Sequence, residues 1–148
     1  MLGKFFHVNI CVRDMDRSVA FYQDLGFNKV NDFTLDDPSV GDALGLTARK
    51  LRGAFMRLGD DPNSMVLDLV QFIDPPPQGD PYPSLNNIGI CRIAFTVDDI
   101  EKTYEAVKAK NVEFVTHLQK LDGPNGDEIG MFCFKDPDGA ILEVISGL

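Results

Sequence analysis

One stretch of this chain repeats another, and this repeat limits the possible folds more than any other feature. The segment Cys91–Val112 (CRIAFTVDDIEKTYEAVKAKNV) aligns without a gap to Phe6–Phe27 (FHVNICVRDMDRSVAFYQDLGF) after a shift of 85 positions, as from His7 to Arg92. Each copy first alternates apolar with polar residues, as a half-buried strand does, and then places apolar residues at helical spacing. Because similarity at a fixed offset indicates repeated structural units, the chain is predicted to contain two copies of one strand-helix unit.

Both copies carry matching start and stop signals for the helix. Asp14 in the first copy, and Asp98 or Asp99 in the second, can accept hydrogen bonds from the first helical amides. The two helices are predicted to end at Gly26 and Asn111, residue types that readily adopt the left-handed conformation.

Three further strands are predicted after each helix. They cover Asn28–Phe33, Ala48–Leu58 and Met65–Phe72 in the first half, and Glu113–Leu121, Gly130–Lys135 and Ile141–Ile145 in the second. The last strands, MVLDLV and AILEVI, correspond at an offset of 75, which sets Asp68 against Glu143. The smaller offset places an insertion at residues 36–46. Each half is therefore predicted to be a βαβββ module of an α+β protein.

The domain organisation follows from the repeat. Residues 1–73 form the first module, residues 74–87 a linker, and residues 88–148 the second module, with the two modules forming one domain. The linker, DPPPQGDPYPSLNN, contains five prolines, which prevent regular structure and stiffen the connection.

Composition narrows the class of partner. A net charge of −9 over 148 residues would repel a phosphate backbone, so nucleic acid is not expected as a partner. No apolar run approaches the roughly 20 residues of a membrane span, and the odd number of cysteines favours reduced thiols in a cytoplasmic protein. A small molecule is the expected ligand, and an anionic one would need a local cationic residue.

Four motifs together resemble one known family. They are HVNICVRDMDRSVAFY with LGF, then VLDL, RIAFTVDDI, and FKDPDGAILEVI. A tandem βαβββ pair with these motifs resembles the vicinal oxygen chelate superfamily, also called the glyoxalase/bleomycin-resistance/dioxygenase superfamily. The resemblance implies curled half-barrel sheets around a cavity, and a homodimer. It also implies, in some members, a divalent ion held by one side chain from the first strand and one from the last strand of each module. Other members hold a ligand without a metal.

The four positions implied as ligands can be compared with this sequence. His7 matches the first strand of module one, and Glu143 matches the last strand of module two. Asp68 is one methylene shorter than the usual glutamate. Arg92 stands where the second histidine is expected, and a guanidinium stays protonated and has no lone pair for a metal. At most His7, Asp68 and Glu143 remain as metal ligands, so a divalent ion is possible in principle, but its absence is the preferred expectation.

Three placements of Arg92 are open. In the preferred one, its planar fork bridges Asp68 and Glu143 and takes the place of the cation. In the second, it turns outward and clamps an anionic substrate beside a three-ligand metal. In the third, it is an exposed strand end with no role.

Catalytic and substrate-binding roles complete the predicted site. His7 is a candidate general base near neutral pH, because imidazoles titrate there, and Glu143 is the second candidate catalytic group. Asn9 shares the face of His7 and is a candidate substrate-binding residue. His117, by contrast, is expected on the surface without a partner.

The function expected from the resemblance is that of a glyoxalase-like protein with a degenerate metal site, acting on a small oxygenated and anionic metabolite. If it is an enzyme, it is expected to be a lyase or isomerase. The alternative is a non-catalytic protein that binds a small molecule, as bleomycin-binding members do. The sequence does not choose between enzyme and binding protein.

Overall fold

The computed structural model describes all residues, 1–148, and they divide into two compact units. Unit 1 is Met1–Gly79 and unit 2 is Asp80–Leu148, so the division falls inside the proline-rich stretch.

Unit 1 contains four strands and two helices. In chain order they are β1 (His7–Cys11), α1 (Met15–Asp24), β2 (Phe27–Asp36), α2 (Ser39–Leu44), β3 (Lys50–Leu58) and β4 (Val66–Asp74). The predicted insertion at residues 36–46 is thus largely the short helix α2.

Unit 2 repeats this order without the inserted helix. Its elements are β5 (Ile93–Thr96), α3 (Ile100–Lys108), β6 (Phe114–Asp122), β7 (Glu128–Lys135) and β8 (Ile141–Ser146). The predicted strands and helices all exist, with ends that differ by a few residues.

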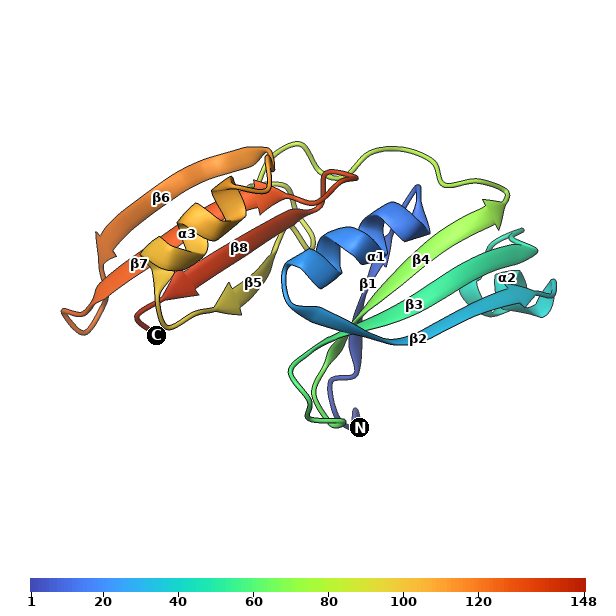
Figure 1. The fold of residues 1–148 in the computed structure, drawn as a ribbon. Helices are drawn as coiled ribbons and strands as arrows, with labels where there is room; N and C mark the ends of the chain where they lie inside the picture. The colour runs from blue at the N-terminus through green and yellow to red at the C-terminus, as the bar shows by residue number, and fades with distance from the viewer. The chain divides into compact units, whose positions relative to one another are not determined.

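The two sheets have the same topology. Their strand orders are β1-β4-β3-β2 and β5-β8-β7-β6, each with one parallel pair between the first and last strands and antiparallel pairs elsewhere. Neither four-stranded sheet closes into a barrel. One long helix lies across one face of each sheet, α1 in unit 1 and α3 in unit 2 (Figure 1). The α+β prediction of tandem βαβββ modules is confirmed.

Helix capping explains why the long helices begin and end where they do. Asp14 accepts a hydrogen bond from the amide of Arg17, and Asp99, rather than Asp98, accepts one from the amide of Lys102. Gly26 and Asn111 have φ values of 98° and 54°, as their positions after the helices predict.

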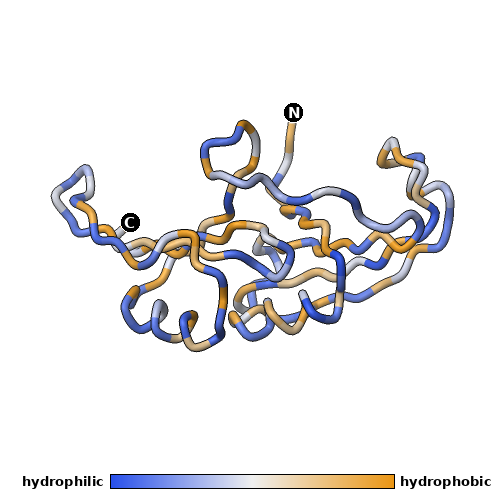
Figure 2. The backbone as a smooth tube through the Cα atoms, turned by 90° about the horizontal axis from the view of Figure 1, so that it is seen from above, coloured by the Kyte–Doolittle hydropathy of each residue, from blue (hydrophilic) through white to orange (hydrophobic).

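The core of unit 1 lies between α1 and its sheet. Met15 and Tyr22 of α1 are fully buried, as are Ala54, Met56 and Leu69 of the strands. Burying one such large side chain stabilises the fold by roughly 1.5–3 kcal/mol. Along both helices, hydrophobic and hydrophilic residues alternate (Figure 2), as expected for elements with one buried face.

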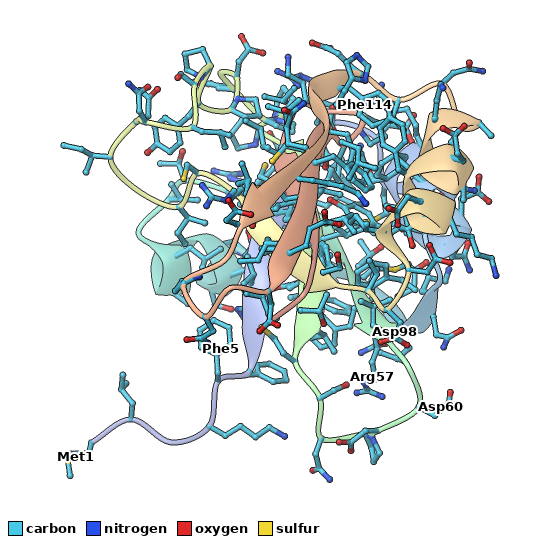
Figure 3. All side chains as sticks on the ribbon, turned by 90° about the vertical axis from the view of Figure 1, so that its left-hand side faces the viewer. Met1, Phe5, Arg57, Asp60, Asp98 and Phe114 are labelled. Carbon is cyan, nitrogen blue, oxygen red and sulfur yellow. The ribbon has the colours of Figure 1, made fainter.

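Aromatic rings dominate the corresponding core of unit 2. Tyr104 of α3 packs against Phe132 of β7 at a ring-centroid distance of 5.3 Å, and Phe132 stacks on Phe134 at 6.0 Å. Phe114, labelled in Figure 3 at the start of β6, contacts all three rings.

His117 corrects one prediction. It is on the surface as expected, but its Nδ1 lies 2.8 Å from the hydroxyl of Tyr104, so it has a partner. The register shift of β6 between Phe114 and Thr116 changes which residues face α3, and simple alternation from the sequence could not show this.

A charged cluster ties each helix to its sheet. In unit 1, Arg52 of β3 pairs with Asp16 of α1 at 2.8 Å and with Asp32 of β2 at 2.9 Å. The pKa of Asp32 is lowered, chiefly by its hydrogen bonds from Arg52. In unit 2, Lys120 of β6 has the same arrangement, with Glu101 at 2.6 Å and Glu128 at 2.8 Å.

No helix of the structure combines the length and the apolar character that crossing a membrane would require.

Candidate functional site

Each sheet has an open face, which we define as the face opposite its long helix. Arg52 reaches α1, so alternation along β3 turns Phe55 to the open face of unit 1, and Asp68, which is directly opposite Phe55, points the same way. In unit 2, Phe132 contacts α3, which turns Cys133 and its cross-strand partner Glu143 to the open face.

The two carboxylates occupy equivalent places in their sheets. Asp68 lies between Asn9 and Phe55, and Glu143 lies between Ala94 and Cys133, in the same strand order. Both are nearly buried, with 9% of Asp68 and 5% of Glu143 exposed. A carboxylate that leaves water is costly unless a partner compensates it, so the partners define the chemistry of each face.

In unit 1 the compensation is partial. Asn9 donates a hydrogen bond from Nδ2 to Asp68 Oδ2 at 3.0 Å, and His7 Nε2 lies 3.9 Å from the same oxygen. The other oxygen, Asp68 Oδ1, is buried and has no hydrogen-bond partner. A buried polar atom without a partner costs about 1–3 kcal/mol, so this oxygen is suited to a donor supplied from outside the chain.

In unit 2 the compensation is a full charge. Arg92 Nε forms an ion pair with Glu143 Oε2 at 2.7 Å, and Cys133 Sγ donates to the same oxygen at 3.8 Å. The pKa of the Cys133 thiol is raised, mainly because burial disfavours the thiolate. Glu143 is therefore held as a paired carboxylate beside a protonated thiol.

The residues do not fit a tightly bound metal ion within either unit. Within neither unit do three or more His, Cys, Asp or Glu side chains gather closely enough to hold one. Unit 1 brings together only His7 and Asp68 of the predicted ligands, and in unit 2 the carboxylate of Glu143 faces a guanidinium, which cannot ligate a cation. Ion pairing with Arg92 also neutralises the charge that would attract a metal.

The predicted site residues thus form two groups. His7, Asn9 and Asp68 are together in unit 1, and Arg92 and Glu143 are together in unit 2. The contact of Arg92 with Glu143 is one half of the predicted bridge, and its other half, to Asp68, stays a prediction.

Sequence reasoning missed two neighbours of the carboxylates. Cys133 was not connected with Glu143, and Phe55 was not connected with Asp68, because both contacts depend on the register of antiparallel strands. The fully apolar environment of each carboxylate in the sequence, VLDLV and ILEVI, was the one available signal that a partner had to exist.

Comparison with known proteins identifies the family. The sequence profile of the Glyoxalase/Bleomycin resistance protein/Dioxygenase superfamily matches residues 4–144. The chain belongs to this superfamily. The match spans both βαβββ modules, as the resemblance of the motifs predicted. Among curated proteins, no sequence matches the chain.

Solved structures of superfamily proteins share the fold. A glyoxalase family protein from Bacillus cereus has a TM-score of 0.84 and 21% identity, over 100% of this chain and 96% of that one. The trypanothione-dependent glyoxalase I of Leishmania major has a TM-score of 0.66 and 21% identity, over 98% of this chain and 87% of that one. A V278E mutant of glyoxalase I from Zea mays has a TM-score of 0.71 and 21% identity, over 96% of this chain and 44% of that one.

Proposed function

We propose that this superfamily member is a glyoxalase-like protein that acts on a small, oxygenated, anionic metabolite and needs no tightly bound metal ion. The observation that carries the proposal is the ion pair between Arg92 and the buried Glu143. The terminal amino groups of Arg92, which Glu143 does not use, supply the hydrogen-bond donors for a ligand's oxygens. Cytoplasmic location and a homodimer, both expected from the sequence, belong to the same proposal.

The geometry of Arg92 supports a role in anion binding. Its side chain is 40% exposed, and in unit 2 only its Nε is used, by Glu143. The terminal amino groups of the guanidinium can then face a carboxylate or an adjacent pair of oxygens, which a planar fork binds through two hydrogen bonds. Glu143 positions the guanidinium by fixing one of its edges.

His7 and Glu143 are the proposed proton-transfer groups. The His7 side chain is 38% exposed, so its imidazole is accessible to a substrate, and histidine is the side chain that enzymes most often use to transfer protons. Asn9, whose Nδ2 is already bonded to Asp68, would assist by fixing that carboxylate rather than by reaching the substrate with the same group.

The first test measures metal binding by the purified protein. Elemental analysis is expected to find no stoichiometric divalent ion, and adding Zn²⁺ or Ni²⁺ is expected to leave the melting temperature unchanged. In Arg92→His, an imidazole replaces the guanidinium beside Glu143, and a saturable stabilisation by Zn²⁺ is expected. Arg49→His is the matched control, because Arg49 is exposed and has no side-chain partner in the structure. Stoichiometric metal in the unaltered protein would contradict the proposal.

The second test measures anion binding. Calorimetric titration with a 2-oxo acid and a 2-hydroxy acid, pyruvate and lactate, is expected to show binding that Arg92→Leu abolishes and Arg49→Leu leaves unchanged. Binding that survives Arg92→Leu would assign the anion to another residue.

A non-catalytic binding protein is the second candidate. The misfit to a metal favours it, because the resemblance associates metal-free members with ligand binding. Chemical analysis of each bound compound, recovered after prolonged incubation, distinguishes the binding protein from the enzyme. An unchanged compound favours the binding protein, and a converted one favours the enzyme.

A further inference from the structure

A row of aromatic rings crosses the open face of unit 1. The ring centroids of Phe33 and Phe55 are 5.7 Å apart, those of Phe55 and Phe6 are 5.8 Å apart, and those of Phe6 and His7 are 4.9 Å apart. Phe55 is also the direct cross-strand neighbour of Asp68. The row therefore runs beside the carboxylate whose Oδ1 has no partner.

These rings are not part of the core that α1 covers. Phe6 is 53% exposed, and Phe33 and Phe55 are partly exposed, whereas Tyr22, which packs under α1, is fully buried. Gly53 makes room for the row, because a Cβ at this position would collide with the ring of Phe33. Partly exposed aromatic side chains beside a few convergent polar groups are typical of small-molecule sites.

Two buried polar atoms without partners lie on this same face. Only three such side-chain atoms occur in the chain: Asp68 Oδ1, Arg57 Nε and Ser18 Oγ. Arg57 is two residues from Phe55 along β3 and pairs with Val66, so it is a diagonal neighbour of Asp68. The labelled Arg57 lies on the strand just before the turn that carries Asp60 (Figure 3). The face thus offers one unused acceptor and one unused donor next to aromatic rings.

We propose that the open face of unit 1 binds a planar nitrogen heteroaromatic ring. The ring packs against Phe55 and its aromatic neighbours, a ring N–H donates to Asp68 Oδ1, and a ring nitrogen accepts from Arg57 Nε. A heteroaromatic ring with both groups satisfies the two unpartnered atoms at once, and this removes the cost of leaving them unpaired. Because this face carries one acidic and one basic side chain, Asp68 and Arg57, a neutral ring is favoured over an ammonium ion.

This inference rests on the proposed function in one respect, that the chain binds a small molecule. It adds the chemical class of the ligand portion that unit 1 recognises. Benzimidazole and its analogues carry no anionic group, so their binding does not require the anion contact assigned to Arg92.

Four probes test the proposal through amide chemical shifts in NMR titrations of the full chain. Benzimidazole carries the N–H donor and the nitrogen acceptor, 1-methylbenzimidazole lacks the donor, indole lacks the acceptor, and indane lacks both. We expect benzimidazole to shift unit 1 amides and to bind at least tenfold more tightly than indane, with the other two between them. Equal affinities for benzimidazole and indane, or shifts confined to unit 2, would overturn the proposal.

Variants assign the contacts to individual residues. Asp68→Asn and Phe55→Leu are each expected to weaken benzimidazole binding at least fivefold. Arg57→Lys keeps the charge but removes Nε–H, so it should weaken benzimidazole but not indole. Phe21→Leu, on α1, is the matched control and should change nothing. Circular dichroism of each variant checks that it is folded. If neither Asp68→Asn nor Phe55→Leu changes the affinity for benzimidazole, the inference is wrong.

Arg92→Leu keeps the two proposals distinguishable. It should abolish pyruvate binding while leaving benzimidazole binding unchanged. If benzimidazole fails to bind while pyruvate binds through Arg92, the heteroaromatic subsite alone is wrong.

Discussion

Asp68 and Glu143 lie at the same point of two copies of one sheet, yet they are compensated in opposite ways. Glu143 has a full positive charge, Arg92, at 2.7 Å, whereas Asp68 has a neutral amide, Asn9, at 3.0 Å and an imidazole at 3.9 Å. Unit 2 therefore neutralises its carboxylate internally, and unit 1 leaves one carboxylate oxygen unused.

The difference arises from the strands beside each carboxylate. Asn9 and Phe55 flank Asp68, while Ala94 and Cys133 flank Glu143 at the same registers. The same strand arrangement therefore supports different chemistry in the two units. The residues on the neighbouring strands, rather than the fold, determine which groups compensate the buried carboxylate.

The largest effect is expected from Arg92→Leu. Removing the guanidinium leaves Glu143 buried with only a thiol as donor, so the free energy of unfolding should fall by about 1–3 kcal/mol. Urea denaturation followed by circular dichroism measures this loss. The double variant with Glu143→Gln should recover most of it, because the uncompensated charge is then gone. Unchanged stability of Arg92→Leu would show that the ion pair does not compensate Glu143.

Asp68→Asn should have the opposite sign. It removes a charge whose Oδ1 has no partner while keeping an oxygen for Asn9 Nδ2, so stability should rise by about 1 kcal/mol. Glu143→Gln, the same change in unit 2, should destabilise, because it breaks the pair with Arg92. If both variants shift the urea midpoint in the same direction, the contrast between the units is lost.

The thiol beside Glu143 gives a kinetic test. Burial raises the pKa of Cys133 above its ordinary value of 9.0, whereas Cys11 is exposed. At pH 8, iodoacetamide should modify Cys133 at least tenfold more slowly than Cys11, because the thiolate is the nucleophile. Mass spectrometry of digested protein follows both sites, and urea-unfolded protein, in which the two rates should converge, is the control.

The same shift has a consequence for stability at high pH. The unfolded thiol loses its proton first, so stability from the protonated Cys133 is fully present below pH 9 and is lost as pH rises through the folded pKa. Rapid modification of Cys133 in the folded protein would argue against its burial beside Glu143.

The smallest effect is expected at the clusters that tie helix to sheet. Arg52→Lys loses the two-pronged contact with Asp32 and should cost about 0.3–1 kcal/mol at pH 7, since the cluster is partly exposed. The pKa of Asp32 is lowered from its ordinary value of 3.8, so the cluster stabilises the folded state fully above pH 3.8. This stabilisation is lost as the pH falls through the lower pKa of the folded state. The cost of Arg52→Lys should shrink accordingly in acid urea titrations.

The matching change in unit 2 serves as the control. Lys120→Arg keeps the charge between Glu101 and Glu128 and should change the urea midpoint little, because these groups are more exposed. A loss larger than that of Arg52→Lys would reverse the expected order of the two clusters.

Much of the fold could be predicted because its signals are local. The caps at Asp14 and Asp99, the left-handed Gly26 and Asn111, and the alternation from His7 to Cys11 each involve residues close in sequence. Prediction failed at His117, because the register shift in β6 gave this residue a partner that alternation along the strand did not show.

The sequence by itself determined two βαβββ modules, a carboxylate in each final strand, and a guanidinium where a second imidazole was expected. Only the tertiary structure decided that Arg92 contacts Glu143, that Asp68 Oδ1 has no partner, and that Phe6, Phe33 and Phe55 form one row. The physical reason is distance along the chain: Asn9 and Asp68 are 59 residues apart, and strand register, which sums many weak contacts, sets which side chains finally meet.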